Sequence, residues 1–345
     1  MIANPPGTRA DDVARLTVCL CTCQRPTMLA RCLESLGAQI LPDDLAISLV
    51  VVDNDPASSA RLTVAQFCAD APFSVYYVHQ PERGIARARN AALGKALDLA
   101  AGWIAMLDDD EIAEPDWIAQ LMHPDYLDVP VLMGRNIAVY PTPRPFWVQV
   151  KEGKSEEGQR LKTAYTGNVR FSIALLQAGL RFDEGLGLMG GEDDEFFALA
   201  HTKGFEIRRT LRAVTYEPVH PERLTYGAQV HRAYWCAASQ LRRLSVTRTW
   251  GGAALRKAHT IPLNLLFGSA WLLASSVPAA LFVFAFMLTR IDGSDDGWAA
   301  RASMALTASF KTMALGGGKK LAKGLGRGTA LIGILPQPYR SIHGA

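Results

Sequence analysis

Four acidic residues in a row, Asp108, Asp109, Asp110 and Glu111, directly follow the apolar stretch 103–107. The apolar stretch predicts a buried strand, so the carboxylates emerge where the chain leaves a sheet. Like charges packed this closely repel one another and raise one another's pKa. A hard divalent cation, which takes oxygen ligands, relieves that repulsion. The run therefore indicates a metal site, with a solvated acidic turn as the alternative.

Two more carboxylates, Asp53 and Asp55, follow a second apolar stretch at 47–52. A carboxylate in that position can accept a hydrogen bond from a nucleotide base N–H or a ribose hydroxyl. Thr22 and Arg25 follow the first apolar stretch, and Arg25 would add positive charge. The alternative is that the two aspartates form an Asx-type turn ahead of the proline that follows them.

Two closely spaced arginines, Arg87 and Arg89, follow Gly84 at the start of a predicted helix. The planar guanidinium fork of arginine matches phosphate oxygens, so this segment could face a nucleotide. An ordinary solvated helix start is the alternative.

A third acidic run begins at Glu192, directly after Gly190 and Gly191. Paired glycines let the backbone approach a ligand closely. A carboxylate held at a helix start beside a substrate hydroxyl can act as a general base. A solvated acidic turn at the helix start is again the alternative.

The elements that must position these groups alternate between short apolar stretches and helical periodicities over residues 15–219. This rhythm favours a parallel α/β sheet covered by helices on both faces. Ligands bind such sheets at the carboxyl ends of the strands, where Asp53 and Asp108 both stand. The predicted strands are 16–20, 47–52, 74–78, 103–107 and 131–133. The predicted helices are one with its face at 28–36, one at 86–99, one opened by Glu114-Pro115-Asp116, one at 194–203 and one at 225–245.

Composition narrows the class of protein. The chain has 345 residues and a net charge of +3, so no global basic field indicates nucleic-acid binding. No early segment has a charged region followed by an apolar core, so we expect the catalytic part in the cytosol. Three of the six cysteines alternate at 19, 21 and 23 and would share one face of a strand. They could form a metal cluster, but buried core thiols are the favoured interpretation.

The C-terminal part of the chain differs in composition. Residues 260–289 carry no charge, which predicts a membrane helix with a buried soluble helix as the alternative. Residues 299–315 could form a second span or an interfacial helix, and 316–327 are basic, as suits anionic headgroups. The expected organisation is a disordered terminus at 1–14, a catalytic domain at 15–247 and a membrane-associated helical region at 248–345. The enzyme would then sit on the cytoplasmic face of the cell membrane.

Taken together, these motifs resemble the family 2 glycosyltransferases with the GT-A fold, over roughly residues 16–245. Residues 107–111 resemble the family's DxD segment, and 191–193 its ED segment. Residues 22–26 and 88–90 stand where its strand-one and nucleotide-binding motifs stand. Together with residues 52–56 and 166–168, these motifs look closest to the branch that builds bacterial exopolysaccharide repeats, the succinoglycan glucosyltransferase type. The implied fold is a mixed, mainly parallel sheet flanked by helices, with a C-terminal membrane segment.

The resemblance implies a nucleotide-sugar site. Asp53, with Thr22 and Arg89, would hold the uracil and ribose of a UDP-sugar. Asp108 would touch the ribose or share a metal ion. The nucleotide-sugar residues implied in this way are Thr22, Arg25, Asp53, Asp55, Arg89, Asp108 and Asp109.

The resemblance also implies a metal site and an acceptor side. Asp108 and Asp110 would hold Mg²⁺ or Mn²⁺ against the diphosphate. Asp193 would deprotonate the acceptor hydroxyl, giving inversion at the anomeric carbon. The acceptor-side residues would be Gly191, Glu192 and Arg232.

The predicted function is an inverting, metal-dependent transfer of one sugar to a lipid-linked acceptor. Two features depart from the family pattern: Asn54 replaces a second aspartate, and no QxxRW motif follows the base, which argues against a processive synthase. The rival enzymes are a sugar-phosphate nucleotidyltransferase, whose basic glycine loop is missing after strand one, and a polyprenyl-phosphate sugar transferase. A catalytically silent membrane component of a polysaccharide complex is a rival from another class.

Overall fold

The computed structural model describes residues 14–145, 148, 155–186, 191–229 and 231–232. These residues fall into two units, a larger one within 14–140 and 155–219 and a smaller one within 141–148 and 220–232. The predicted membrane segments at 260–289 and 299–315, the basic tail and most of the helix predicted at 225–245 lie outside the described residues. Within the described ranges, no helix has both the length and the apolar character needed to cross a bilayer.

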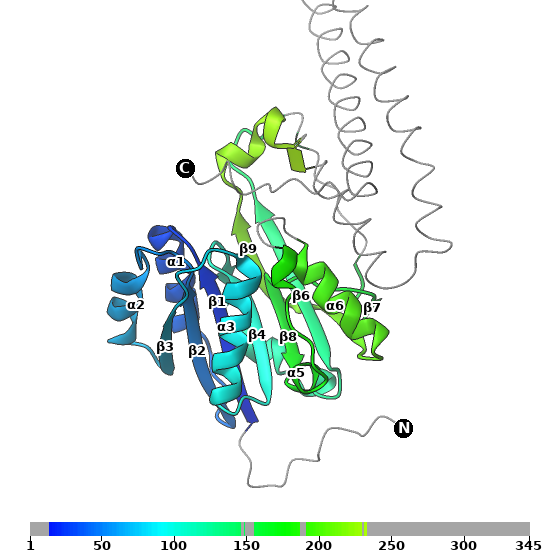
Figure 1. The fold of residues 1–345 in the computed structure, drawn as a ribbon. Coiled ribbons are helices and arrows are strands. Elements are labelled where there is room, and N and C mark those ends of the chain that lie inside the picture. Colours follow the sequence, from blue (N-terminus) through cyan, green and yellow to red (C-terminus); the bar gives the residue numbers. More distant parts are fainter. Residues whose placement is uncertain (1–13, 146–147, 149–154, 187–190, 230, 233–345) are drawn as a thin grey trace, which may run out of the picture. The chain divides into compact units, whose positions relative to one another are not determined.

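One sheet organises the larger unit (Figure 1). In the part of the chain that the structure describes, its order is β3-β2-β1-β4-β8-β6-β9-β5, and β7 pairs with β9. The strands are β1 (Ala14–Thr22), β2 (Leu45–Asp53), β3 (Ser74–His79), β4 (Trp103–Asp108), β5 (Ile112–Ala113), β6 (Val131–Val139), β7 (Arg160–Leu161), β8 (Asn168–Ser172) and β9 (Ile207–Pro218).

One half of the sheet is parallel and the other half is mixed. Strands β3, β2, β1 and β4 run parallel, so Thr22, Asp53 and Asp108 reach the same edge. Strand β8 runs antiparallel to both β4 and β6, and β9 runs parallel to β6. The start of β8 therefore meets the carboxyl end of β4, with Asn168 opposite Leu107.

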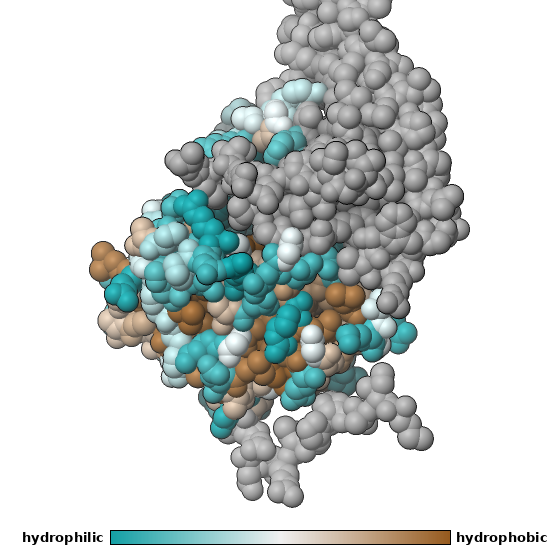
Figure 2. All heavy atoms as spheres, viewed as in Figure 1, coloured by the Kyte–Doolittle hydropathy of each residue, from teal (hydrophilic) through white to brown (hydrophobic). Residues whose placement is uncertain are grey.

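Helices cover both faces of the sheet. Alternation in β1 sends Val18 and Leu20 into one core, with α1, α2 and α4, and Cys19 into the other, with α3, α5 and α6. In Figure 2 the viewed face carries many hydrophilic side chains with apolar areas between them. The helices are α1 (Pro26–Gly37), α2 (Arg61–Cys68), α3 (Ile85–Asp98), α4 (Trp117–Leu121), α5 (Ala174–Gln177) and α6 (Glu192–Thr202), with 3₁₀ turns η1 (Pro124–Tyr126), η2 (Glu184–Leu186) and η3 (Pro221–Leu224).

The mixed α/β sheet flanked by helices is confirmed, and the first four predicted strands are present within a few residues of their expected bounds. The strand rhythm alone predicted a parallel sheet and did not reveal that β8 runs antiparallel to both of its neighbours, β4 and β6. Helix α4 begins at Trp117, so Pro115 precedes the helix instead of opening it. Helix α6 begins at Glu192 instead of Asp194, which places Asp193 in its first turn. Cys19 is buried in the core and Cys21 packs against it, as the alternation predicts.

Candidate active site

The DxD-like segment leaves β4 with its first carboxylate accessible and its second buried. The Asp108 side chain is 48% exposed, whereas that of Asp109 is 6% exposed. Although about half of the Asp108 side chain is exposed, the protein around it removes enough water to raise its pKa to about 6; Asp110 and Asp193 add to the rise, and Arg89 offsets part of it. The charges of Asp108, Asp110 and Asp193 therefore act on one another at the carboxyl edge of the sheet.

Asp109 ties this segment to the end of β1. Its carboxylate accepts a 2.7 Å hydrogen bond from the Thr22 hydroxyl and a 3.2 Å hydrogen bond from Arg25 Nη1. The same guanidinium nitrogen lies 3.5 Å from Asp110 Oδ2. Burial raises the pKa of Asp109 to about 6 despite these partners. Thr22, Arg25 and Asp109, all predicted to bind the nucleotide, thus bind one another and fix the direction of the acidic run.

Asp53 is fully buried at the end of β2, and both of its carboxylate oxygens accept hydrogen bonds from the protein. Oδ1 accepts from the backbone N–H of Asp55 at 3.1 Å, which is the Asx-type turn considered above. Oδ2 accepts from Ala60 N at 2.8 Å and from the Tyr77 hydroxyl at 3.0 Å. Asp55 is also buried and accepts from Gln24 Nε2 at 3.1 Å. These contacts shape the loop after β2 from within.

Asn54, the departure from the family pattern, joins the end of β2 to the start of α3. Its amide nitrogen donates to the carbonyls of Gln80 and Glu82, each at 2.8 Å. Its amide oxygen accepts from the N–H of Gly84 at 2.8 Å. An aspartate here could accept but not donate, so asparagine is the residue that this loop requires. Sequence reasoning noted the substitution and missed its role.

Arg89 links Asp108, predicted on the donor side, to Glu192, predicted on the acceptor side. The side chain is 8% exposed, pairs with the buried Glu192 and lies 3.7 Å from Asp108 Oδ1. Its guanidinium also lies 5.6 Å from the centre of the Phe182 ring. The charges of Glu192 and Asp108 outweigh burial and raise the pKa of Arg89 above its ordinary value. Glu192 is 5% exposed, so in this structure it serves Arg89 instead of facing an acceptor.

Asp193, the predicted base, lies in the first turn of α6 after Gly191. Gly191 has a φ of 90°, a left-handed conformation that glycine adopts readily. The N–H of Asp194 donates to Asp193 Oδ1 at 2.7 Å and orients the carboxylate. Burial raises the pKa of Asp193 to about 6, with Arg89 lowering it and Glu192 raising it. A carboxylate with that pKa is ionised at neutral pH and still a better base than a surface aspartate.

Gly167 lies at the end of the loop before β8, where a larger side chain would clash with Glu111 and Asp108. A Cβ added there would lie 2.5 Å from Glu111 Oε1 and 3.2 Å from Asp108 Oδ2. Glu111 is buried, pairs with the Asn136 amide and leaves Oε2 without a hydrogen-bond partner. Burial and the charge of Asp108 raise the pKa of Glu111 well above its ordinary value. The sequence analysis included Gly167 in the motif at 166–168 and assigned it no role, because no local pattern shows which residues pack against it.

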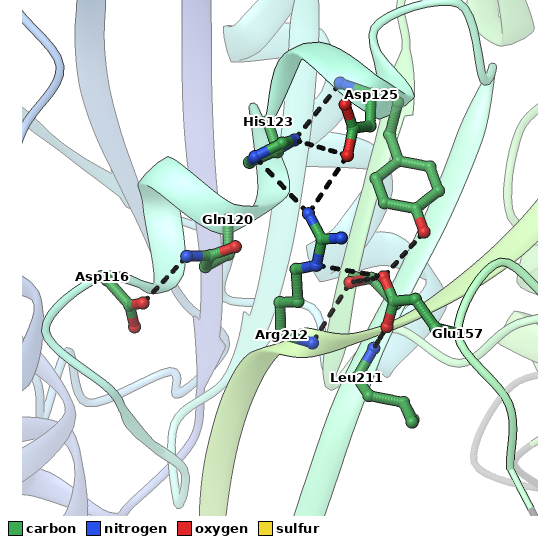
Figure 3. A network of polar contacts seen from close by, with 9 residues as sticks. Asp116, Gln120, His123, Asp125, Glu157, Leu211 and Arg212 are labelled. Atoms are coloured by element: carbon green, nitrogen blue, oxygen red, sulfur yellow. Dashed lines mark hydrogen bonds and ion pairs between the residues drawn. The ribbon is translucent and has the colours of Figure 1, made fainter.

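A polar network anchors the segment that leads into this loop (Figure 3). Glu157 accepts from Tyr126 Oη at 2.6 Å, from Thr210 Oγ1 at 2.9 Å and from Leu211 N at 2.6 Å. Burial opposes ionisation of Glu157, but the hydrogen bond from Tyr126 and its other donors hold its pKa below the ordinary value. Arg212 lies 3.6 Å from the same carboxylate.

The acidic residues fit a divalent cation of the magnesium type. Among the described residues, no three His, Cys, Asp or Glu side chains form a metal-binding group. Such ions, however, usually take one or two protein carboxylates and leave the other positions to phosphate and water. Asp108 and Asp110 offer only oxygen donors, and the raised pKa of Asp108 reflects burial and repulsion that a cation would relieve.

Arg232, predicted on the acceptor side, is exposed and belongs to the smaller unit. The predicted site residues of the larger unit come from the ends of β1, β2 and β4 and the starts of α3 and α6. Hydrogen bonds and ion pairs join Thr22, Arg25, Asp109 and Asp110 into one set, and Asp108, Arg89 and Glu192 into another.

The fold and the acidic edge define a glycosyltransferase of the GT-A-like class. The mannosyltransferase PcManGT of Pyrobaculum calidifontis, solved with GDP-Man and Mn²⁺, is similar with a TM-score of 0.56 and 17% identity, over 95% of this chain and 89% of that one. The S. aureus TarS structure matches with a TM-score of 0.49 and 19% identity. The match covers 74% of this chain and 48% of the TarS chain.

The chain belongs to glycosyl transferase family 2. The family model matches residues 17–177. The succinoglycan biosynthesis protein ExoM of Rhizobium meliloti (strain 1021) is 31% identical over 258 residues, which cover 72% of this chain and 78% of ExoM. The protein is therefore a glycosyltransferase related to a succinoglycan biosynthesis protein.

Proposed function

We propose that this enzyme moves one sugar from a UDP-sugar to a hydroxyl group of a lipid-linked saccharide precursor, with inversion at the anomeric carbon. The observation that carries the proposal is the bridge made by Arg89. It lies 3.7 Å from the donor-side Asp108 and pairs with Glu192, the residue before the candidate base Asp193. A single carboxylate base placed across from the donor-side acids suits direct displacement.

In the proposed reaction the Asp193 carboxylate takes the proton of the acceptor hydroxyl. The acceptor oxygen then attacks the anomeric carbon, and the bond from that carbon to the diphosphate oxygen breaks. The electron pair of that bond leaves with the diphosphate, and the proton stays on Asp193 until it passes to solvent. Arg89 offers a positive charge near the departing diphosphate.

Asp108 and Asp110 would hold a Mg²⁺ or Mn²⁺ ion, which offsets the charge of the leaving diphosphate when it is bound. Asp109 supports both of them indirectly, because Thr22 and Arg25 fix its side chain. The buried Asp53 and Asn54 would serve the nucleotide by shaping the loops after β2 and before α3.

The similarity to a succinoglycan biosynthesis protein supports a saccharide acceptor in exopolysaccharide assembly. The uncharged stretch at 260–289 supports attachment to the cytoplasmic face of the cell membrane, where a lipid-linked acceptor would lie. On this proposal 15–247 form the catalytic domain and 248–345 the membrane-associated region. Transfer to polyprenyl phosphate would use the same donor residues.

Calorimetric titration of UDP, with and without Mn²⁺, tests the donor site. We expect binding that strengthens with Mn²⁺ in the natural protein and loses that dependence in Asp110→Ala. Asp44→Ala, at an exposed position on the chain before β2, is the control and should behave as the natural protein does. Unchanged metal dependence in Asp110→Ala would remove Asp110 from the site. Binding of GDP or dTDP in place of UDP would show that the donor carries a nucleobase other than uracil.

A further inference from the structure

The Phe182 ring contacts both of the helices that supply the candidate site, α3 and α6. The residue is 2% exposed, so the ring lies in the core. It stacks on the ring of Phe196 on α6, with the ring centres 4.4 Å apart and an angle of 19° between the ring planes. The guanidinium of Arg89 on α3 lies over the same Phe182 ring, 5.6 Å from its centre. Phe182 therefore joins the helix of the buried arginine to the helix of the candidate base.

The side-chain amide of Asn90 holds the backbone of Phe182. Asn90 Oδ1 accepts from the Phe182 N–H at 3.0 Å, and Asn90 Nδ2 donates to the Phe182 carbonyl at 2.9 Å. The same Nδ2 donates to Glu184 Oε1 at 3.0 Å. An amide has one acceptor oxygen and two N–H donors, so these three bonds use both of its polar atoms. Asn90 lies in the motif at 88–90 predicted to bind the nucleotide, yet its amide serves the chain at 182–184.

The position of the Arg89 guanidinium matters because it meets two carboxylates at once. It pairs with Glu192 and lies 3.7 Å from Asp108 Oδ1. The planar fork of arginine must take one orientation to reach both groups, whereas its long side chain has many rotatable bonds. An aromatic face attracts the cation and restricts where the guanidinium lies. An aliphatic side chain in the place of Phe182 would fill space without that attraction.

We propose that Phe182 is a positioning residue of the transfer reaction, which holds the Arg89 guanidinium between Asp108 and Glu192, and that Asn90 holds Phe182 in turn. Both residues act through Arg89 and touch neither substrate. Loss of the ring would release the guanidinium from its orientation beside Asp108, where the diphosphate of the donor is expected. This inference rests on the proposed function, since it concerns the arginine that faces the departing diphosphate.

The test is a double-mutant cycle, read by calorimetric titration of UDP into the full-length protein in the presence of Mn²⁺. Phe182→Leu keeps an apolar side chain and removes the ring, and we expect roughly fivefold weaker UDP binding. Asn90→Ala leaves the core side chains in place and should weaken UDP binding to a similar extent. Arg89→Lys keeps the charge and lacks the fork. Adding Phe182→Leu to Arg89→Lys should therefore cause almost no further loss, because residues that act as a unit are not additive.

Phe67→Leu is the matched control, because it also replaces one ring of an aromatic pair. Phe67 lies on α2, 6.3 Å from Phe73 between ring centres, and packs against the core on the opposite face of the sheet. It should bind UDP as the natural protein does. Urea unfolding of each variant shows that the titrated protein is folded.

The outcomes separate this inference from the proposed function. Tight UDP binding by the natural protein and by Phe182→Leu alike would overturn the inference alone. An equal loss from Phe182→Leu in the natural and Arg89→Lys backgrounds would also overturn it, because Phe182 would then act through general packing. An equal loss in Phe67→Leu would have the same consequence. Absence of UDP binding by the natural protein would count against the proposed function, and the inference would fall with it.

Discussion

The ion pair between Arg89 and Glu192 gives the sharpest prediction, because the same helix offers a matched control. Arg89 and Glu192 are 8% and 5% exposed, so solvent screens their interaction little. Two positions earlier on α3, Arg87 pairs with Glu82, and those side chains are 41% and 69% exposed. The two pairs have the same chemistry and differ in burial.

Glu192→Gln removes the negative charge and leaves a buried guanidinium. Breaking a buried pair in this way costs about 3–5 kcal/mol of unfolding free energy. In the variant Arg89 would still have a carboxylate partner, Asp108, 3.7 Å away. That partner reduces the expected loss of unfolding free energy to about 2–3 kcal/mol. Glu82→Gln should cost about 0–1 kcal/mol, as exposed pairs do.

Urea unfolding followed by tryptophan fluorescence measures both losses, and the pH dependence of transfer provides a second readout. Glu192 helps to raise the pKa of Asp193 to about 6. Because the base must be ionised, activity rises with pH through that pKa, and Glu192→Gln should move the rise to lower pH. Equal stability losses in the two variants, or an unmoved pH profile, would refute this reasoning.

Three further predictions concern the residues around the acids. Asn54→Asp loses two part-buried hydrogen bonds to the carbonyls of Gln80 and Glu82 and should cost about 1–3 kcal/mol in urea unfolding, with weaker UDP binding by calorimetry. A neutral result would contradict the role given to the Asn54 amide. Gly167→Ala places a Cβ 2.5 Å from Glu111 and should cost about 1–3 kcal/mol and most of the transfer activity, so full activity in an assay would show that the loop yields. The folded pKa of Asp108, about 6, exceeds its ordinary 3.8, so its charge disfavours the fold as the pH rises through 6. Asp108→Asn should therefore raise the melting temperature more at pH 8 than at pH 5, and a pH-independent difference would contradict that sign.

The parallel half of the sheet could be predicted because its signal is local. Buried strands covered on both faces read as continuous apolar stretches such as 47–52 and 103–107, and polar residues mark their ends. The carboxyl edge then collects Asp53 and Asp108 by topology alone. The reversal at β8 could not be predicted, since strand direction depends on partners distant in the sequence.

The candidate site was predictable in its residue types and only partly in their roles. Motif spacing predicted Arg89 and Asp193 as site residues, but it gave no sign that Arg89 pairs with Glu192. Asp53 and Asp109 carry the charges that a nucleotide site requires, yet the fold turns both toward protein donors. Such choices depend on which donors lie near each oxygen after folding, which the sequence does not display.

The measurement that tests the central claim most directly is sugar transfer by Asp193→Asn, compared with its binding of the donor. We expect the variant to bind UDP-sugar in the presence of Mn²⁺ as tightly as the natural protein does, because the proposed role of Asp193 is toward the acceptor and not the donor. We expect transfer to be abolished, because an amide cannot take the proton of the acceptor hydroxyl. Undiminished transfer by Asp193→Asn would contradict the account.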